Sequence, residues 1–439
     1  MNSDDCDERV CVIGAGPSGL ATCKALAEAG IPFDCFEANP GVGGIWDIER
    51  CDRGGYRSLH TNTSKTKMAF SDFPFPEQSP PFLHHSGMLE YFNAYADHFG
   101  FRDQIHFDSK VATATPTEDN AWAIELENGS CQKYRACIVA TGQYGTKRWP
   151  VAMPDGEFKG QQIHAADYLD PETPVDCRDK RVIVVGLGSS AAEIATELAG
   201  GADGPPVAAH VMLSARSGRF ILPKTVEGVP LDASAPHPSA PLPSILAWMP
   251  APIRTWLMQR FLKHALGRLE AQTGRPSKWN LPNPDFPAWA ERPTLSDGFI
   301  PALEQKRIEA RPEIAALDGK RIRFVDDTTT EADVIIWATG YQPAFPFLGE
   351  EILGGDASDL ALYRRIAHPQ RPNLFFIGFT RVICSLWPLS EQQALWLADV
   401  LSGAIELPSQ STQIRKAIAV AQTLPVFCNS YVLDLHRDR

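Results

Sequence analysis

The sequence lacks the cysteine patterns that several common functions require. Its ten cysteines include no CxxC pair and no Cys/His cluster at the spacing of metal ligands, so we expect neither a metal site nor a dithiol redox centre. Cys11, Cys35 and Cys137 fall within apolar segments, and we interpret them as thiols of the core. No dense run of Lys and Arg is present and the net charge is -12, which argues against a nucleic-acid partner.

Long hydrophobic runs are missing as well. The two most apolar segments, 244–262 and 373–389, are interrupted by prolines and arginines, so we expect neither to span a membrane. The start of the chain, MNSDDCDERV, is acidic and has no basic residues followed by an apolar run, so we expect no secretory signal there. These patterns predict a cytoplasmic protein without a transmembrane anchor.

The chain has the composition of a globular protein, and its 439 residues are enough for two or three domains. An apolar run that ends at Ile13 leads into the turn GAGPSG at 14–19, a helical pattern and a second apolar run that ends at Glu37. In such a unit the first glycine permits a tight bend, the second lets a pyrophosphate approach, and the third lets the helix pack on the strand. The phosphates lie at the helix N-terminus, and Glu37 is placed to accept hydrogen bonds from a ribose. We interpret this unit as an FAD site.

A second unit of the same kind starts with the apolar run 182–185. The turn GLGSSA follows at 186–191, so Ala191 takes the place of the third glycine and should hold helix and strand slightly further apart. The next strand ends at Arg216 and not at an acid. A guanidinium there would pair with the 2'-phosphate of NADPH. The alternative is an ordinary surface arginine without a ligand.

An internal repeat connects the two units. Each is followed by short β segments, at 121–142 and 320–340, that end in the same letters, Ala-Thr-Gly. We therefore predict an α/β protein of two Rossmann-like dinucleotide-binding domains, each with a small β insertion, in the two-domain plan of glutathione reductase.

The predicted FAD domain is discontinuous and comprises residues 1–175 and 325–439. The predicted NADPH domain is 176–324, and it carries a proline-rich insertion at about 225–293 with one helical pattern from Ile253 to Ala265. We expect this insertion to pack over the nucleotide domain. An active-site cover and a dimer contact are the alternatives.

The segment before the second unit has the pattern FxGxxxHxxxY, formed by Phe158, Gly160, His164 and Tyr168. Taken alone, His164 would more often be a packing residue between domains than an acid or a base. The pattern as a whole is more specific, because it occurs in order with four other motifs. These are GAGPSG, GVGGIW at 41–46, GLGSSA and ATGY at 338–341.

With these five ordered motifs the chain resembles the flavin-containing monooxygenases over most of its length. The resemblance implies an enzyme that uses FAD, NADPH and O2, forms a C4a-hydroperoxyflavin and oxygenates a soft nucleophile, giving an N-oxide or S-oxide of a small molecule. A homodimer is a further possibility that the family suggests. The resemblance also places Asn62 beside the flavin and the nicotinamide, where its amide would assist catalysis. An asparagine in such a loop is otherwise an ordinary turn residue.

The glycine turns and the resemblance together predict which residues contact each cofactor. The expected FAD contacts are Gly14, Gly16, Pro17, Ser18, Gly19, Glu37, Gly44, Ile45, Trp46, Thr61, Asn62, Thr63, Thr141, Gly142 and Gln393. The expected NADPH contacts are Gly186, Gly188, Ser189, Ser190, Ser214, Arg216, Ser217, Thr339 and Gly340.

The sequence departs from the family pattern in several places. Ser189 stands where an asparagine is usual and Glu193 where an aspartate is usual, and both positions bear on NADPH binding. The insertion is longer than in many members. The hydrophobic C-terminal anchor of the animal members is missing, which is typical of bacterial-type members.

Three other functions remain open at this point. A Baeyer-Villiger monooxygenase converts ketones to esters, and its best-known class ends the FxGxxxHxxx pattern in tryptophan, where this chain has Tyr168. A pyridine nucleotide-disulfide reductase would need a reactive cysteine pair, which is not present. A flavin-bound sensor or scaffold would leave the NADPH site without a use.

Overall fold

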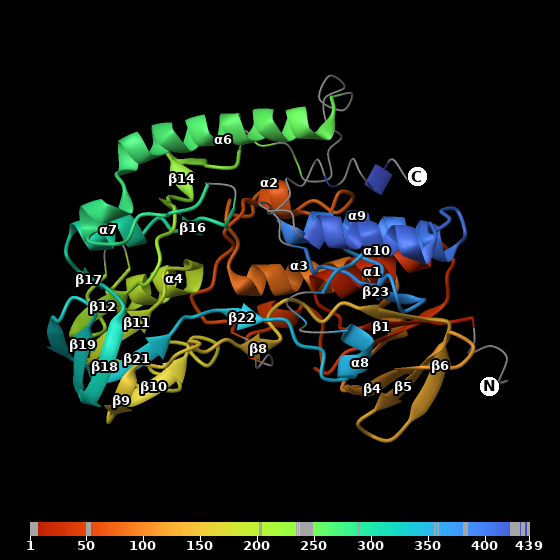
Figure 1. Ribbon diagram of the computed structural model, residues 1–439, viewed down its shortest axis with the longest axis horizontal. Coiled ribbons are helices and arrows are strands. Elements are labelled where there is room, and N and C mark those ends of the chain that lie inside the picture. Colours follow the sequence, from red (N-terminus) through yellow and green to blue (C-terminus); the bar gives the residue numbers. More distant parts are fainter. Residues whose placement is uncertain are drawn as a thin grey trace.

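The computed structural model describes residues 8–49, 54–201, 204–233, 235, 237, 249–287, 290–354, 357, 360–380, 385–421, 431, 435 and 436. Parts of the proline-rich insertion, including residues 238–248, lie outside these ranges. Two five-stranded parallel sheets dominate the described chain and lie side by side (Figure 1).

The first sheet has the strand order β23-β7-β1-β2-β3. Its strands are β1 (Val10–Ile13), β2 (Phe33–Phe36), β3 (Ile105–His106), β7 (Ala136–Val139) and β23 (Leu374–Phe376). Val10 and Val12 of β1 face the core of the helices α1 (Pro17–Glu28), α3 (His85–His98) and α9 (Leu386–Leu401). Cys11 and Ile13 face the opposite side. Strand β1 is apolar throughout because both faces of the sheet are covered.

A three-stranded antiparallel sheet covers that opposite side. It consists of β4 (Val111–Pro116), β5 (Trp122–Leu126) and β6 (Cys131–Tyr134), seen at the lower right of Figure 1. Trp122 is fully buried in the shared core. Cys11, Cys35 and Cys137 are fully buried free thiols, so their prediction as core residues is confirmed.

The second sheet has the strand order β10-β21-β11-β12-β17. Its strands are β10 (Gln161–His164), β11 (Arg181–Val185), β12 (His210–Ser214), β17 (Ile308–Arg311) and β21 (Val334–Trp337). Helices α4 (Ser189–Leu198) and α7 (Phe299–Glu304) pack on one face. The other face packs on a sheet of β9 (Asp155–Phe158), β18 (Ile314–Gly319), β19 (Arg321–Phe324) and β20 (Thr329–Glu331). The predicted fold, two Rossmann-like units each with a β insertion, is confirmed.

The sheets divide the chain at other points than the predicted boundaries after residues 175 and 324. Strands β9 and β10 precede 175, and β21 follows 324, yet all three belong to the second unit. The chain crosses between the units through β8 (Thr146–Lys147) and β22 (Tyr341–Gln342), which pair with each other. We therefore propose boundaries between β8 and β9 and between β21 and β22. The sequence prediction missed these boundaries because a glycine turn identifies only the first central strand of a unit. It does not indicate that an edge strand, such as β10, comes before that central strand in the same sheet.

The insertion forms a long helix, α6 (Ala251–Thr273), which exceeds the predicted span at both ends. It lies across the top of Figure 1 over both units. Strand β13 (Ile221–Leu222) pairs with β16 (Thr294–Leu295), and β14 (Thr225–Val226) forms a hairpin with β15 (Val229–Pro230). Among the described helices, none combines the length and apolar character needed to cross a bilayer.

Short elements complete the described chain. They are η1 (Gly44–Trp46), α2 (Lys65–Met68), η2 (Arg102–Gln104), η3 (Pro276–Trp279), α8 (Glu350–Leu353) and α10 (Gln410–Ala421).

Candidate active site

One cavity of about 1700 Å³ connects the two units, because it is lined by residues of both glycine turns, by the loop 61–63 and by α6. It opens at the carboxyl ends of the central strands β1 and β11, which is where ligands bind in sheets of this type. Within the described ranges, no group of three His, Cys, Asp or Glu residues could hold a metal ion.

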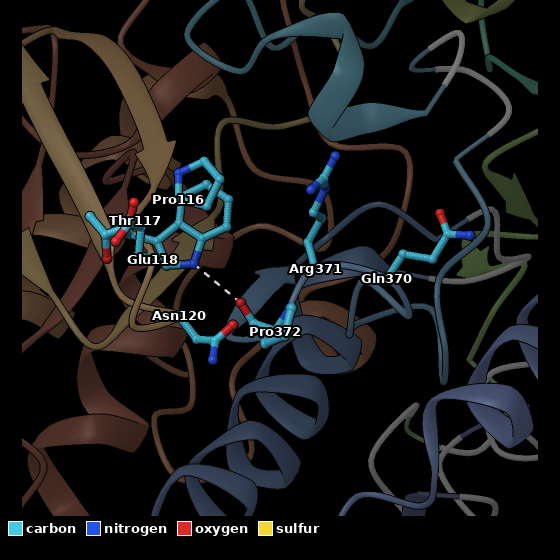
Figure 2. A pocket seen from close by; sticks show the side chains of 8 residues that line it. Pro116, Thr117, Glu118, Asn120, Gln370, Arg371 and Pro372 are labelled. Carbon is cyan, nitrogen blue, oxygen red and sulfur yellow. Dashed lines mark hydrogen bonds between the residues drawn. The ribbon is translucent and has the colours of Figure 1, made fainter.

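A second hollow of about 390 Å³ lies elsewhere on the first unit (Figure 2). Its lining comes from the β4–β5 turn and from Gln370, Arg371 and Pro372. The indole Nε1 of Trp122 donates a hydrogen bond to the Pro372 carbonyl oxygen at 3.3 Å. Neither glycine turn contributes to this hollow, so the large cavity is the candidate active site.

The three glycines of the first turn have different surroundings. Gly14 has a φ of 101°, and a Cβ there would lie 3.0 Å from the Ala140 carbonyl oxygen. A Cβ on Gly19 would lie 1.8 Å from the Gly14 carbonyl oxygen, so only glycine lets α1 pack this closely on the turn. A Cβ on Gly16 would meet its nearest atom, the Gly44 Cα, at 3.7 Å. Gly16 therefore faces open space in the cavity, as close approach of a pyrophosphate requires.

Glu37 is buried at the end of β2 and lines the cavity. One carboxylate oxygen accepts a hydrogen bond from the Ala15 amide at 2.7 Å. The other accepts from the amide of Asn39 at 2.9 Å and from its side chain at 3.0 Å. These donors compensate the burial of the charge, and the carboxylate keeps lone pairs for a ribose.

Most of the other expected FAD contacts also line the cavity. They are Pro17, Ser18, Gly44, Ile45, Trp46, Thr61, Asn62, Thr63, Thr141 and Gly142. Gln393 does not, because it is fully buried on α9 and its amide accepts from the Gly378 amide at 3.0 Å and donates to Thr380 and Tyr431, each at 3.0 Å. Gln393 thus fixes the chain after β23. Gly19 lies behind the cavity wall, as its packing on Gly14 requires.

Asn62 lines this cavity and has an unsatisfied side-chain oxygen. Its Oδ1 is buried and has no hydrogen-bond partner among the described residues. The preceding Thr61 is held at three points: its amide donates to the Leu83 carbonyl oxygen at 2.8 Å, its hydroxyl accepts from the Leu83 amide at 3.0 Å, and its carbonyl accepts from Lys224 at 3.2 Å. The position of Asn62 is therefore fixed by the backbone, while its amide remains available to a ligand.

The second glycine turn follows the same plan with one adjustment. A Cβ on Gly186 would lie 2.5 Å from the Ala338 carbonyl oxygen, whereas one on Gly188 would meet no atom within 4 Å. Ala191 is fully buried, and its methyl group would lie 3.7 Å from a Cβ at Gly186. The alanine therefore fits where a third glycine is usual.

The expected NADPH contacts divide into two groups. Ser189 and Ser190 line the cavity at the N-terminus of α4, for which Gly188 is the N-cap. The remaining members do not line the cavity and are Gly186, Gly188, Ser214, Arg216, Ser217, Thr339 and Gly340. Ser214 is buried and its hydroxyl donates to the Pro312 carbonyl oxygen at 2.7 Å, so its side chain is used within the fold.

Arg216 lies beyond the end of β12 with 67% of its side chain exposed. Its Nε is 3.9 Å from a carboxylate oxygen of Glu313, which is a weak surface ion pair. The guanidinium can therefore turn to a phosphate without loss of a strong contact.

The FxGxxxHxxxY motif lies at the junction of the units and not in the cavity. His164 is fully buried at the end of β10; its Nδ1 accepts from the Ala166 amide at 3.0 Å, and its ring lies 5.4 Å from that of Trp149 and 5.6 Å from that of Tyr341. Burial lowers the pKa of His164 below its usual value. The Tyr168 hydroxyl donates to Glu197 at 2.8 Å. The geometry is that of a packing motif.

The two other members of the motif also serve packing. Phe158 is buried in the core between the second sheet and its β insertion. A Cβ on Gly160 would lie 2.5 Å from the Asp333 carbonyl oxygen, so the glycine permits the close approach of these two segments.

Lys224 is a cavity residue that sequence reasoning missed. Its Nζ donates to a Glu193 carboxylate oxygen at 2.9 Å as well as to the Thr61 carbonyl, and Tyr56 donates to the other oxygen of Glu193. The side chains of Lys224 and Glu193 are only 10% and 13% exposed. Burial, followed by the charge of Glu193, raises the pKa of Tyr56. Because Lys224 is 163 residues from Thr61 in sequence, no local pattern could have found this contact.

Comparison with known proteins identifies the family. The model of the flavin-binding monooxygenase-like family matches residues 7–434. The chain is 32% identical to dimethylaniline monooxygenase (N-oxide-forming) 2 of Rattus norvegicus, over 93% of this chain and 76% of the rat protein. It is also 32% identical to flavin-containing monooxygenase 1 of Homo sapiens, over 95% of this chain and 78% of the human protein.

Solved structures share the fold. S-allyl-L-cysteine S-oxygenase from Allium sativum superposes with a TM-score of 0.67 at 22% identity, over 98% of this chain and 88% of that one. An open crystal structure of cyclohexanone monooxygenase gives 0.71 at 20% identity, over 98% and 97%. The match of the family model over nearly the whole chain, together with the curated relatives, shows that the protein belongs to the flavin-binding monooxygenase-like family and is an oxidoreductase that uses FAD and NADPH, with O2 as co-substrate.

Proposed function

We propose that this enzyme oxygenates the nitrogen or sulfur of a small molecule. The observation that carries the proposal is the unsatisfied Oδ1 of Asn62 in the cavity that joins the two glycine turns. A rigid backbone with a free amide is suited to hold a reacting group in one orientation. The curated relative named for N-oxide formation and the structural neighbour named for S-oxygenation support the same class of reaction.

The first turn would hold FAD. The amides at the start of α1 bind the pyrophosphate, with Gly16 leaving room for it, and Glu37 accepts the ribose hydroxyls. Bound FAD supplies the transfer of electrons from NADPH to O2 and of one oxygen atom to the substrate. Asn62 donates from its amide nitrogen and accepts at Oδ1, so it can orient groups on the side of the cavity that faces the second turn.

The second turn would hold NADPH. Ser189 and Ser190 lie at the N-terminus of α4, where backbone amides favour an anion, and Arg216 binds the 2'-phosphate. Helix α6 contributes the apolar side chains of Met258, Phe261 and Leu262 to the cavity lining. Apolar lining of this kind favours a site with little water around the reacting groups.

Product analysis tests this proposal against the conversion of ketones to esters. The purified holoenzyme is supplied with NADPH and O2 and with equal concentrations of an aryl methyl sulfide and a cyclic ketone. We expect oxygen-dependent NADPH consumption and formation of the sulfoxide in excess over the lactone. Lactone as the main product would establish the Baeyer-Villiger reaction, and the absence of both products would refute oxygenation of small molecules by this site.

A further inference from the structure

The hairpin after Lys224 brings a carboxylate to the cavity wall. Strands β14 and β15 pair, and the Leu231 amide donates to the Lys224 carbonyl oxygen at 2.8 Å. Asp232 follows this hairpin and lines the cavity. One of its carboxylate oxygens accepts a hydrogen bond from the Ser64 amide at 2.8 Å. The hairpin of the second unit is thus attached to the loop that carries Asn62.

The other carboxylate oxygen of Asp232 has no partner. This Oδ1 is buried. It forms no hydrogen bond and no ion pair with the part of the chain that the structure describes. Lys224, at the base of the same hairpin, directs its Nζ to Glu193 and Thr61 instead. A buried carboxylate oxygen without a donor is costly, so a bound donor would stabilise it. Glu37, the other carboxylate of the cavity considered above, already has three donors.

The cavity has both apolar and basic side chains in its lining. Apolar surface comes from Phe220, Leu222, Val226, Leu231, Phe261 and Leu262, and the basic residues Lys67, Lys110, Arg268 and Arg292 also line the cavity. Charge–charge attraction is stronger beside apolar side chains than in water, and Lys224, a further basic residue of the lining, already pairs with Glu193. Asn62 is two residues from Ser64, a span of at most about 7 Å along the chain. A group bound at Asp232 would therefore lie within the length of a small molecule from Asn62.

We propose that Asp232 binds a cationic group of the substrate, so that this enzyme selects small thioethers or amines that carry an ammonium group separate from the atom that is oxygenated. The inference rests on the proposed function, whose chemistry occurs at the Asn62 end of the cavity. Asp232 determines substrate specificity in this proposal. It takes no part in oxygen transfer and binds the end of the substrate that is remote from the oxygenated atom.

Two substrates that differ only in charge test the inference. 3-(Methylthio)propylamine and butyl methyl sulfide have the same thioether and nearly the same size, but only the first carries an ammonium group at neutral pH. We expect the wild-type enzyme to have the higher kcat/KM, measured as sulfoxide formed, for the amine. Asp232→Asn retains an oxygen for the Ser64 amide and removes the charge. It should lower kcat/KM for the amine by about tenfold to a hundredfold, mainly through KM, and leave the neutral sulfide unchanged.

The hairpin offers a matched control. Glu227 is exposed and does not line the cavity, so Glu227→Gln removes the same charge from the same hairpin and should leave both substrates unchanged. An equal loss for both substrates in Asp232→Asn, or a preference for the amine that survives this substitution, would overturn the inference.

Binding without turnover separates this inference from the proposed function. Propylguanidinium carries a cation and no soft nucleophile, and its binding can be followed by the change in the flavin absorbance spectrum. We expect Asp232→Asn, with normal flavin content, to weaken this binding by at least about tenfold, and Glu227→Gln to leave it unchanged. If the wild type oxygenates neither sulfide, the proposed function fails while this titration still decides the role of Asp232. Equal affinity in wild type and Asp232→Asn refutes that role.

Discussion

At the scale of single residues, the site combines side chains whose hydrogen bonds are complete with a few that are left open. Thr61 and Gln393 use their polar atoms within the fold. Asn62 and Asp232 each keep a buried oxygen without a partner among the described residues. Native proteins rarely leave such atoms unsatisfied, and these two residues also line the cavity. We therefore expect substitutions at Asn62 and Asp232 to change activity more than stability.

Asn62→Ala should separate NADPH consumption from product formation. The substitution removes the amide but leaves the backbone contacts of Thr61 that hold the loop. We expect flavin content and NADPH oxidation to persist, while product per NADPH falls by about tenfold or more and released hydrogen peroxide rises. The control is Asn128→Ala, in the exposed β5–β6 turn. Unchanged product per NADPH in Asn62→Ala would contradict the assigned role.

His368 should contribute to the loss of stability in acid. Burial lowers its pKa to about 4, below the value of about 6.5 in an unfolded chain. Between these two values the unfolded state binds a proton that the native state does not, so the free energy of unfolding falls as the pH falls. Denaturant unfolding at pH 7 and pH 4.5 should show a smaller decrease for His368→Asn than for wild type, by about 2 kcal/mol. An identical decrease would show that this residue is not involved.

At the scale of elements, both nucleotide sites depend on a strand that ends in a glycine turn and a helix that begins there. The turn fixes where the amides of the helix N-terminus point, and its glycines keep that space free of side chains. Gly19 and Gly186 serve the packing of the fold, whereas Gly16 and Gly188 leave room on the ligand side. Substitution of the two kinds of glycine should therefore have different consequences.

Gly188→Ala should impair NADPH binding while the protein still folds. The added methyl group would meet no protein atom within 4 Å but would occupy the space that a pyrophosphate needs. We expect the KM for NADPH to rise by about tenfold or more with unchanged flavin content. Gly267→Ala, within α6 and also without a neighbour, is the control and should have no effect on this KM. A normal KM in Gly188→Ala would place the pyrophosphate elsewhere.

At the scale of the whole molecule, two sheets are held in one arrangement by contacts between distant parts of the chain. The connecting strands β8 and β22 pair directly. Lys224 and Glu193 from the second unit meet Tyr56 and Thr61 from the first, next to Asn62. Lys224, Tyr56 and Thr61 line the cavity, so this buried network links the position of α4 and its turn to the loop that carries Asn62.

The Lys224–Glu193 pair should be energetically coupled. In a double-mutant cycle of Lys224→Met and Glu193→Gln, followed by denaturant unfolding of the holoenzyme, we expect a coupling free energy of about 1 to 3 kcal/mol. The exposed pair Lys278–Glu304, at 2.7 Å, provides the control cycle, with an expected coupling of less than about 1 kcal/mol. Equal coupling in the two cycles would show that the buried network does not hold the units together.

Sequence alone determined the parts of this protein that depend on neighbouring residues. Both glycine turns, the helices and strands beside them, the repeat and the two-unit fold follow from spacing and periodicity, and the ordered motifs were enough to indicate the family. The burial of Cys11, Cys35 and Cys137 was equally local, since each lies in an apolar strand. Local patterns suffice here because the glycine turn, the start of the helix and the apolar pattern of each strand are set by residues only a few positions apart, although the strands pair with distant segments.

Only the tertiary structure decided which residues line the cavity and which sheet each strand joins. It showed that Tyr168 and Gln393 form hydrogen bonds within the fold, that His164 is buried with only its Nδ1 hydrogen-bonded among the described residues, and that β9, β10 and β21 belong to the second unit. It also brought Lys224 and Asp232 to the loop of Asn62, more than 160 residues away in sequence. Such contacts leave no local pattern, because burial and charge pairing are set by whatever part of the chain the fold brings near.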